Sequence, residues 1–390
     1  MDLHRIVCPN SGLTVRTARP QGPAGTAVTA AAPPASDSRP LGNVTSSATD
    51  ADLKQQMDDL IKGFSTQSVE RGYWVEDSMV EGTIPAELEG TLLRNGPGIF
   101  EIGSRSIPQP FDGDGMVCSF AFKDGKAFFR NKLVRTEGFV AEQRAQKQLY
   151  RSAFNKGKAE GVWFNSPFDL AVKNVANTNV IHWGGKTLAL YERGLPHHLD
   201  DNLTTVGTDD LAGSVDGNKV SRHQVHQRNG DLPSISPHAQ GLPNRYTYIV
   251  ASAYEGAEVF GPSNSVWKVE MDPNLGSSLP FDRSTITQSV WTPGPGKIAQ
   301  EPIFVPRSSS SGSGNAEDDG WVMTMVYDAT TNRSSLAILD AQRIEEGPVC
   351  SIGLTHHIPL GLHGSFTPAY LGPSPGAVDC CFEYDTREGV

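Results

Sequence analysis

Along most of this chain, apolar residues occur in short runs of strand length, separated by turn-forming residues. Two pairs of runs flank Asp124-Gly125 and Gly184-Gly185, which favour tight hairpin turns. On this pattern, strands are predicted over residues 116–122, 126–130, 179–183, 186–191, 245–253, 265–271, 321–327 and 334–339. Repeated antiparallel hairpins of this kind predict an all-β protein, built as a propeller or a sandwich.

Helical spacing interrupts the strand pattern at two places. The first predicted helix begins near residue 50 and carries an apolar stripe of Leu53, Met57, Leu60, Ile61 and Phe64. The second is predicted over residues 140–154 as a helical insertion. The segment 308–319 is rich in Ser, Gly and acidic residues, which predicts a flexible surface loop. The helices are therefore expected as short additions to a β framework.

Composition and charge exclude two classes of protein. The chain has 390 residues and a formal net charge of −11, and its Lys and Arg residues form no cluster, so nucleic-acid binding is not expected. No apolar run of transmembrane length occurs. The first 49 residues are rich in Ala, Ser, Thr and Pro, and the few charges up to Pro34 are mostly Arg. This composition favours a plastid transit peptide, or otherwise a disordered terminus.

Patterns for zinc and calcium are not met. The five cysteines are odd in number and fit no zinc spacing, which favours a reduced state: Cys8, Cys118, Cys350, Cys380 and Cys381. Asp112 and Asp114 lie two apart as in a calcium loop, but the remaining EF-hand positions do not follow. Tight turns are the simpler reading of this acidic pair.

Four motifs in a fixed order identify a family resemblance. They are E-G-T-L-L-R-N-G-P-G (89–98), F-D-G-D-G-M-V (111–117), Q-E-P-I-F-V-P-R (300–307) and P-L-G-L-H-G-S-F (359–366). Together they resemble the carotenoid cleavage dioxygenases, and the pattern is most similar to the apocarotenoid oxygenases. The resemblance implies a seven-bladed β-propeller. We expect this chain to form that propeller incompletely, with short helical insertions, because it is too short for seven blades and the family's long insertions.

The resemblance also implies a metal centre. The family binds one Fe²⁺ per intact subunit through four neutral histidines from separate blades, and nearby carboxylates accept the other N–H groups of those histidines. His363, in P-L-G-L-H-G, matches one ligand position. Glu192, Glu301 and Asp231 match the carboxylate positions, with aspartate at residue 231 where the family usually has glutamate.

The middle of the chain departs from the family pattern. The motifs T-A-H-P, H-D-F and H-H-x-N-A-[YW]-E, which carry the other three histidines, do not occur, and only 39 positions separate Glu192 from Asp231. His223, His226 and His238 are substitute metal candidates, and the alternative reading is that they are polar surface residues. The predicted organisation is a terminus (1–49), a front part of the propeller (50–213), a junction replacing missing blades (214–230), a back part (231–368) and an atypical tail (369–390).

The implied reaction is oxidative cleavage of a conjugated C=C bond of a carotenoid or apocarotenoid to carbonyl products, with dioxygen as co-substrate. No side chain is predicted to be catalytic apart from those around the metal. A peripheral membrane contact would suit a bilayer-dissolved substrate. Because three ligand motifs do not occur, this chain is expected to be impaired. The alternatives are a catalytically silent truncated isoform, a gene-model fragment, or a propeller-derived binding protein.

Overall fold

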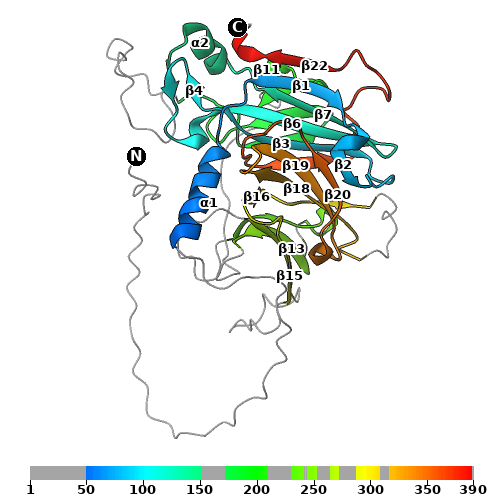
Figure 1. Cartoon of the computed structure of the whole chain (residues 1–390). Coiled ribbons are helices and arrows are strands. Elements are labelled where there is room, and N and C mark those ends of the chain that lie inside the picture. The colour runs from blue at the N-terminus through cyan, green and yellow to red at the C-terminus, as the bar shows by residue number, and fades with distance from the viewer. Residues whose placement is uncertain are drawn as a thin grey trace, which may run out of the picture. The chain divides into compact units, whose positions relative to one another are not determined.

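The computed structural model describes residues 50–150, 172–209, 230–240, 242, 244–252, 264–271, 287–307 and 316–388 (Figure 1). All of them lie in the unit Gly42–Val390. Apart from single 3₁₀ turns, the helices of this described part are α1 (Asp50–Lys62) and α2 (Glu137–Ala145). The remaining elements are strands, so the prediction of an all-β protein with short helical insertions is confirmed.

Four larger antiparallel sheets make up the described strands. Sheet 1 has the order β21 (Gly364–Thr367), β3 (Gly90–Ile99), β6 (Asp114–Lys123), β7 (Lys126–Leu133), β1 (Val69–Trp74), β22 (Phe382–Asp385). Sheet 2 has the order β11 (Thr205–Thr208), β10 (His197–Leu199), β9 (Lys186–Leu190), β8 (Asn179–Trp183). Sheet 3 has the order β12 (Gly230–Ser234), β13 (Tyr246–Ala251), β14 (Ser265–Glu270), β15 (Thr287–Trp291).

Sheet 4 completes the set. Its order is β16 (Lys297–Ala299), β18 (Gly320–Asp328), β19 (Arg333–Asp340), β20 (Pro348–Gly353), β2 (Val80–Gly82), and β17 (Ile303–Pro306) also pairs with β18. A small hairpin is formed by β4 (Glu101–Ile102) and β5 (Arg105–Ser106). The sheets have a propeller-like arrangement, while the number of seven blades stays an expectation.

Turn chemistry explains the hairpins that the sequence predicts. Asp124 and Gly125 both adopt positive φ angles, of 52° and 68°, between β6 and β7. Gly184 and Gly185 do the same, at 60° and 76°, between β8 and β9. Two consecutive residues with positive φ match the twist of the flanking strands, which is why these dipeptides give two-residue loops.

Buried side chains connect the four sheets in a series. One core cluster joins sheet 1 to sheet 4, with Phe120 and Phe129 packing near Met323 and Ile338. A second cluster joins sheet 3 to sheet 4, and a third joins sheet 1 to sheet 2. The series is therefore 2–1–4–3, and none of the clusters in the described part joins sheet 2 directly to sheet 3.

Helix α1 packs against sheet 4 with part of its predicted stripe. Leu60, and Phe64 just beyond the helix, contact a buried group around Tyr327 and Leu360. Ile61 also belongs to the predicted stripe, but its side chain is 51% exposed, so the buried face is narrower than expected. No helix in the described ranges has the length and apolar character needed to cross a membrane.

Helix α2 is shorter than the predicted helix over 140–154. It begins after Thr136, whose hydroxyl accepts the Phe139 amide, and ends at Gln146 in the left-handed conformation. The Glu142 carboxylate then accepts the amides of Leu149 and Tyr150, at 2.8 and 3.0 Å. These bonds offer the backbone an alternative to further helical turns, and residues 151–154 lie outside the described ranges.

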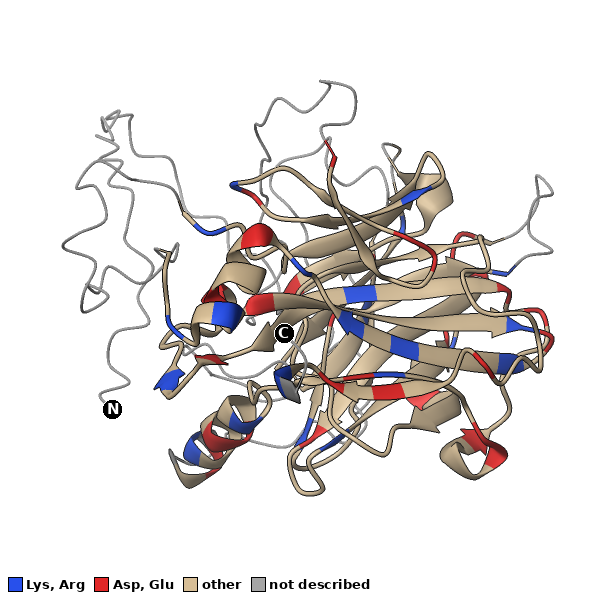
Figure 2. Cartoon of the chain, turned by 90° about the horizontal axis from the view of Figure 1, so that it is seen from above, with Lys and Arg blue, Asp and Glu red and all other residues tan. Residues whose placement is uncertain are grey.

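Charged residues of both signs are spread over the described elements, as Figure 2 shows. Ion pairs among the described residues include Arg71–Glu383, Arg245–Glu270 and Lys268–Asp318.

Candidate metal centre

His363 lies at the point where the four sheets come together. It immediately precedes β21, and its backbone N–H donates to Thr178 O, just before β8, at 3.1 Å. Its carbonyl accepts the Asn95 amide of β3 at 2.9 Å. The imidazole meets Glu301, which stands between β16 and β17 of sheet 4. Asp231 of β12 is close enough to act on it electrostatically.

Glycines around His363 permit this close approach. A Cβ on Gly364 would lie 2.2 Å from Leu93 O, and a Cβ on Gly96 would lie 2.5 Å from the Cα of Gly361. Both distances are too short for any side chain, so β3 and the P-L-G-L-H-G segment can pack backbone to backbone only with glycine at these positions. The motif therefore sets the location of the histidine before any metal is considered.

The carboxylate of Glu301 orients the ring of His363. Nδ1 of His363 lies 2.8 Å from Oε1 of Glu301, while Oε2 of Glu301 accepts from the guanidinium of Arg94 and from the Gly364 amide. Because an ionised carboxylate only accepts, Nδ1 carries the proton and Nε2 is the basic nitrogen. Histidines that bind metals have this arrangement.

Electrostatics at this pair favour the protonated ring when no metal is present. The hydrogen bond to Glu301 raises the pKa of His363 above its ordinary value, against the opposing effects of burial and the positive charge of Arg94. The His363 side chain is 40% exposed and that of Glu301 is 11% exposed. The imidazole thus stands at a surface with its carboxylate partner beneath it.

Glu192 is connected to His363 through one residue, Thr178, which hydrogen-bonds to both. Its Oε2 accepts from the hydroxyl of Thr178 at 3.0 Å, and the carbonyl of Thr178 accepts the backbone N–H of His363. Glu192 is exposed, and its hydrogen-bond partner in the described structure is this hydroxyl rather than an imidazole. The structure therefore places Glu192 near His363 but not as a direct partner of any described histidine.

Asp231 is positioned differently from the other two carboxylates. It is exposed, and its Oδ1 accepts the amide of Leu232 at 2.8 Å. Leu232 has a positive φ of 57°, at an irregularity in the pairing of β12 with β13. The short side chain of aspartate thus bonds to its own backbone, and its effect on His363 is confined to a contribution that raises the pKa of the imidazole.

The other histidine candidates do not join His363 in the described part of the chain. His238 is exposed in a 3₁₀ turn, Pro237–Ala239. His223 and His226 lie outside the described residues. Within the described ranges, no group of three or more His, Cys, Asp or Glu side chains could hold a metal ion. These residues therefore do not fit a four-histidine iron site.

Three further histidines occupy other environments. His182 Nδ1 lies 3.0 Å from the hydroxyl of Thr187 on the paired strand β9. His356 packs against Tyr73 and Phe129, with ring centroids 6.0 and 5.4 Å away. His357 Nε2 lies 3.1 Å from the hydroxyl of Ser65. Each of these rings is engaged away from His363.

Arg94 is the residue of this site that the sequence analysis did not select. It is 3% exposed, and it supplies the positive charge that Glu301 needs in a buried position. The signal was available, because an arginine in the otherwise uncharged run T-L-L-R-N-G requires an acidic partner if the strand is buried. Thr178 gave no comparable signal, since a threonine next to a strand is ordinary.

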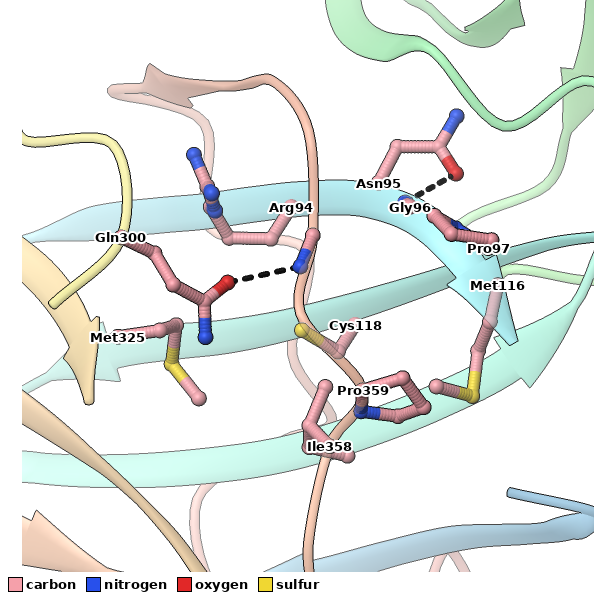
Figure 3. A pocket seen from close by; sticks show the side chains of 11 residues that line it. Arg94, Asn95, Gly96, Pro97, Met116, Cys118, Gln300, Met325, Ile358 and Pro359 are labelled. Carbon is pink, nitrogen blue, oxygen red and sulfur yellow. Dashed lines mark hydrogen bonds between the residues drawn. The ribbon is translucent and has the colours of Figure 1, made fainter. Parts of the chain in front are cut away.

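A small pocket lies beside Arg94, on the side of Gln300 (Figure 3). Gln300 Oε1 accepts the Gly361 amide at 2.8 Å, which fixes the orientation of the amide group. The lining is partly apolar, with Met116, Cys118 and Met325. The pocket has room for a water-sized molecule, so it is not a tunnel for a polyene.

Comparison with known sequences identifies the family of this chain. The sequence model of the family described as "Retinal pigment epithelial membrane protein" matches residues 63–224 and 214–368. This chain therefore belongs to that family, the carotenoid oxygenases. It is similar to apocarotenoid-15,15′-oxygenase of Synechocystis sp., with 30% identity over 476 residues, which cover 79% of this chain and 96% of the relative.

Further relatives are named as oxygenases with other substrates. Isoeugenol monooxygenase of Pseudomonas nitroreducens is 24% identical, over 75% of this chain and 94% of the relative. Carotenoid cleavage dioxygenase 7, chloroplastic, of Oryza sativa subsp. japonica is 32% identical, over 38% of this chain and 26% of the relative. The relatives are thus named as oxygenases acting on several kinds of substrate.

Solved structures show the same fold. The cobalt-substituted apocarotenoid oxygenase of Synechocystis aligns with a TM-score of 0.68 and 28% identity, covering 80% of this chain and 98% of that one. A threonine-to-alanine variant of the same protein aligns with a TM-score of 0.68 and 27% identity, with the same coverage. The propeller class predicted from the sequence is confirmed by these matches.

The alignment with the Synechocystis relative contains long gaps in this chain. It extends over 476 positions, yet 79% of 390 residues is only about 308, so about 168 positions have no counterpart here. The family match is also divided, and its two segments meet at residues 214–224.

Proposed function

We propose that this fold and the His363–Glu301 pair derive from an iron(II)- and dioxygen-dependent oxygenase that cleaves a conjugated C=C bond of an apocarotenoid into two carbonyl products. The observation that carries the proposal is the hydrogen bond of 2.8 Å between His363 Nδ1 and Glu301 Oε1, which leaves Nε2 as the basic nitrogen. The names of the relatives support the reaction class, and the cobalt-substituted relative supports a metal requirement.

A spacing in the variants of the solved relative supports the role of Glu192. Three of those structures substitute a threonine, a tryptophan and the glutamate that follows the tryptophan, and the threonine precedes the glutamate by 14 positions. In this chain Thr178 precedes Glu192 by 14 positions, and the aromatic Tyr191 stands just before Glu192. We infer that these are the corresponding residues and that Glu192 would orient a second histidine ligand in a complete propeller.

The 390-residue chain itself is proposed to lack this activity. Iron needs several imidazoles at one point, and the described residues bring one histidine there. His182, His356 and His357 have other contacts, so they do not supply the missing histidine ligands. The chain would then be a catalytically silent isoform or a gene-model fragment.

The order of the sheets suggests where the missing part belongs. Sheets 2 and 3 stand at the two ends of the series 2–1–4–3, and residues 210–229 connect β11 of sheet 2 to β12 of sheet 3. About 168 positions of the relative have no counterpart in this chain. We propose that the absent blades stood between sheets 2 and 3, and that residues 214–230 replace them.

The test compares this chain with one whose middle is restored. The restored chain carries the corresponding middle segment of the Synechocystis oxygenase between Gly213 and Asp231. Both proteins are purified anaerobically with Fe²⁺, and iron per chain is measured. Cleavage is then assayed with an apocarotenal and with isoeugenol, because relatives are named for both substrate classes. The expected result is one iron and cleavage in the restored chain, and neither in the 390-residue chain.

His363→Ala provides the control in both proteins. It should remove iron and cleavage from the restored chain and change nothing in the chain as it stands. Stoichiometric iron and oxygen-dependent cleavage by the 390-residue protein, both lost in His363→Ala, would show that it is an active enzyme. A restored chain that folds but still binds no iron would refute the role proposed for His363.

Two further expectations remain proposals. Plastid targeting depends on residues 1–49, which lie outside the described residues, and a peripheral membrane contact would bring the protein to a bilayer-dissolved substrate. The chloroplastic relative from Oryza sativa supports the first of them. Import of a fluorescent fusion into isolated chloroplasts, with and without residues 1–49, tests it directly.

A further inference from the structure

The C-terminal segment folds onto sheet 1 although it lies beyond the family match, which ends at residue 368. Strand β22 pairs antiparallel with β1, and the two come from opposite ends of the described chain (Figure 1). The indole N–H of Trp74 donates to Ala377 O at 2.8 Å, and the hydroxyl of Thr386 donates to Ser68 O at 2.9 Å. The segment is therefore anchored at both ends of the strand.

Two adjacent thiols occupy the turn that leads into β22. The thiol of Cys380 donates to Ala377 O at 3.0 Å, the same carbonyl that accepts from Trp74. The backbone N–H of Cys381 donates to Val378 O at 3.2 Å, which closes the turn that contains both cysteines. The two cysteines are thus consecutive residues at a turn and not within a strand, where consecutive side chains would point to opposite faces.

Exposure separates this pair from the other described cysteines. Cys381 is exposed and Cys380 is half-buried, whereas Cys118 and Cys350 are 2% and 0% exposed. A thiol must be reached by its reagent, so only the pair at the turn can react while the described part stays folded.

The surroundings of the pair include a fixed positive charge. The guanidinium of Arg130 is 2% exposed; burial lowers its pKa, and the nearby Cys380 acts in the opposite direction without reversing that effect. Burial raises the pKa of Cys380 itself, so the half-buried thiol is the poorer attacking group. The exposed Cys381 is the better first nucleophile, with Cys380 placed to resolve the product.

We propose that Cys380 and Cys381 form a vicinal dithiol that a peroxide converts to a disulfide. The Cys381 thiolate attacks one peroxide oxygen, the O–O bond breaks, and water leaves after protonation, giving a sulfenic acid. The Cys380 sulfur then attacks the Cys381 sulfur, the S–O bond breaks, and a second water leaves with the Cys380 proton. Two thiols are oxidised by two electrons, and one hydrogen peroxide is reduced to two waters.

The test uses the full chain with Cys8→Ser, so that the remaining cysteines are the four described ones. Native protein is treated with equimolar hydrogen peroxide, free thiols are counted with dithionitrobenzoate, and the intact mass is measured. The count of accessible thiols should fall from two to none, with loss of two hydrogen atoms and no dimer, and dithiothreitol should restore both. Proteolytic mass mapping should place the bridge in the peptide that contains both residues.

Matched variants separate the dithiol from general oxidation. In Cys380→Ser the sulfenic acid at Cys381 has no resolving thiol, so dimedone should trap it in good yield, whereas the unsubstituted dithiol should give little adduct. Cys118→Ser should behave as the unsubstituted chain does. The proposal would be overturned by an intermolecular disulfide dimer, or by two thiols that remain free after peroxide treatment. Cys381→Ser changes an exposed side chain and provides a second variant if Cys380→Ser does not fold.

Discussion

Glu301 and His363 are 62 positions apart in the chain and are joined by a hydrogen bond of 2.8 Å from Nδ1 to Oε1. The other oxygen of Glu301 is occupied by Arg94 and by the Gly364 amide, so the carboxylate cannot turn away from the imidazole. The ring is therefore oriented in advance, with Nε2 available as a ligand. This part of the proposed metal site is oriented, although the described residues do not complete the site.

Glu301→Gln tests how much this orientation contributes. In the chain with the restored middle segment, an amide would replace the ionised acceptor, so His363 would be a weaker and less fixed ligand. We expect the affinity for Fe²⁺ to fall by about 10–100-fold, the usual effect of losing such a partner. Competition with a chromogenic chelator measures it, and Glu345→Gln, a change at an exposed surface position, should leave the affinity unchanged.

Lys173 is expected to be essential for stability. Its ammonium group lies 2.7 Å from Asp114 and 2.6 Å from Glu142, and the side chains of all three are at most 6% exposed. Lys173→Met would leave two buried carboxylates without their counter-charge. We expect the free energy of unfolding to fall by about 3–5 kcal/mol, measured by urea denaturation.

Lys186→Met is the matched control for that substitution. Lys186 pairs with Asp209, but its side chain is 45% exposed, so the pair is largely screened by water. We expect a change of no more than about 1 kcal/mol. Equal losses in the two variants would mean that burial of the Lys173 group does not determine its contribution.

His356 should make the protein sensitive to acid. Burial lowers its pKa to about 3, and both ring nitrogens lack a hydrogen-bond partner in the described structure. An unfolded histidine titrates near pH 6.5, so between about pH 6.5 and pH 3 the unfolded chain binds a proton that the folded chain excludes. The stability due to the neutral ring is thus complete above pH 6.5 and is lost as the pH falls toward 3.

His356→Leu should remove that dependence. Between pH 7 and pH 5 the proton linkage of one such histidine lowers the free energy of unfolding by on the order of 2 kcal/mol. The difference between the unsubstituted chain and the variant should therefore change by this amount over the same interval, as measured by urea denaturation at both pH values. A difference that does not vary with pH would show that the ring is protonated as readily in the folded state.

Removal of the tail should expose the edge of β1. Truncation after Pro368 deletes β22 with its four pairs to β1, together with the bond from Trp74 to Ala377. An unpaired edge strand favours association between chains. We expect a lower melting midpoint and aggregation, measured by calorimetry and light scattering.

Gly72→Leu is a single substitution with the same purpose. A Cβ at Gly72 would lie 2.5 Å from the ring of Phe382, so the side chain would displace β22 without shortening the chain. It should reproduce the lower midpoint. A truncated protein that is monodisperse and melts as before would show that the tail is not part of the stable fold.

The local elements were predictable because each depends on neighbouring residues. Asp124-Gly125 and Gly184-Gly185 adopt the positive φ angles that two-residue hairpins require, and the strands beside them form where the apolar runs indicate. The end of α2 was not predictable from periodicity, because Glu142 accepts the Leu149 and Tyr150 amides through a side chain seven and eight residues away.

The sequence by itself determined the family and the hairpins and selected His363 and Glu301 as candidate site residues, since these depend on motifs whose residues are close along the chain. Only the tertiary structure decided that Arg94 neutralises Glu301, that Thr178 links Glu192 to His363, and that the tail supplies a strand beside β1. The physical reason is that charge compensation and strand pairing act between residues distant in the chain, and a one-dimensional pattern records a buried charge but not the partner that folding brings to it.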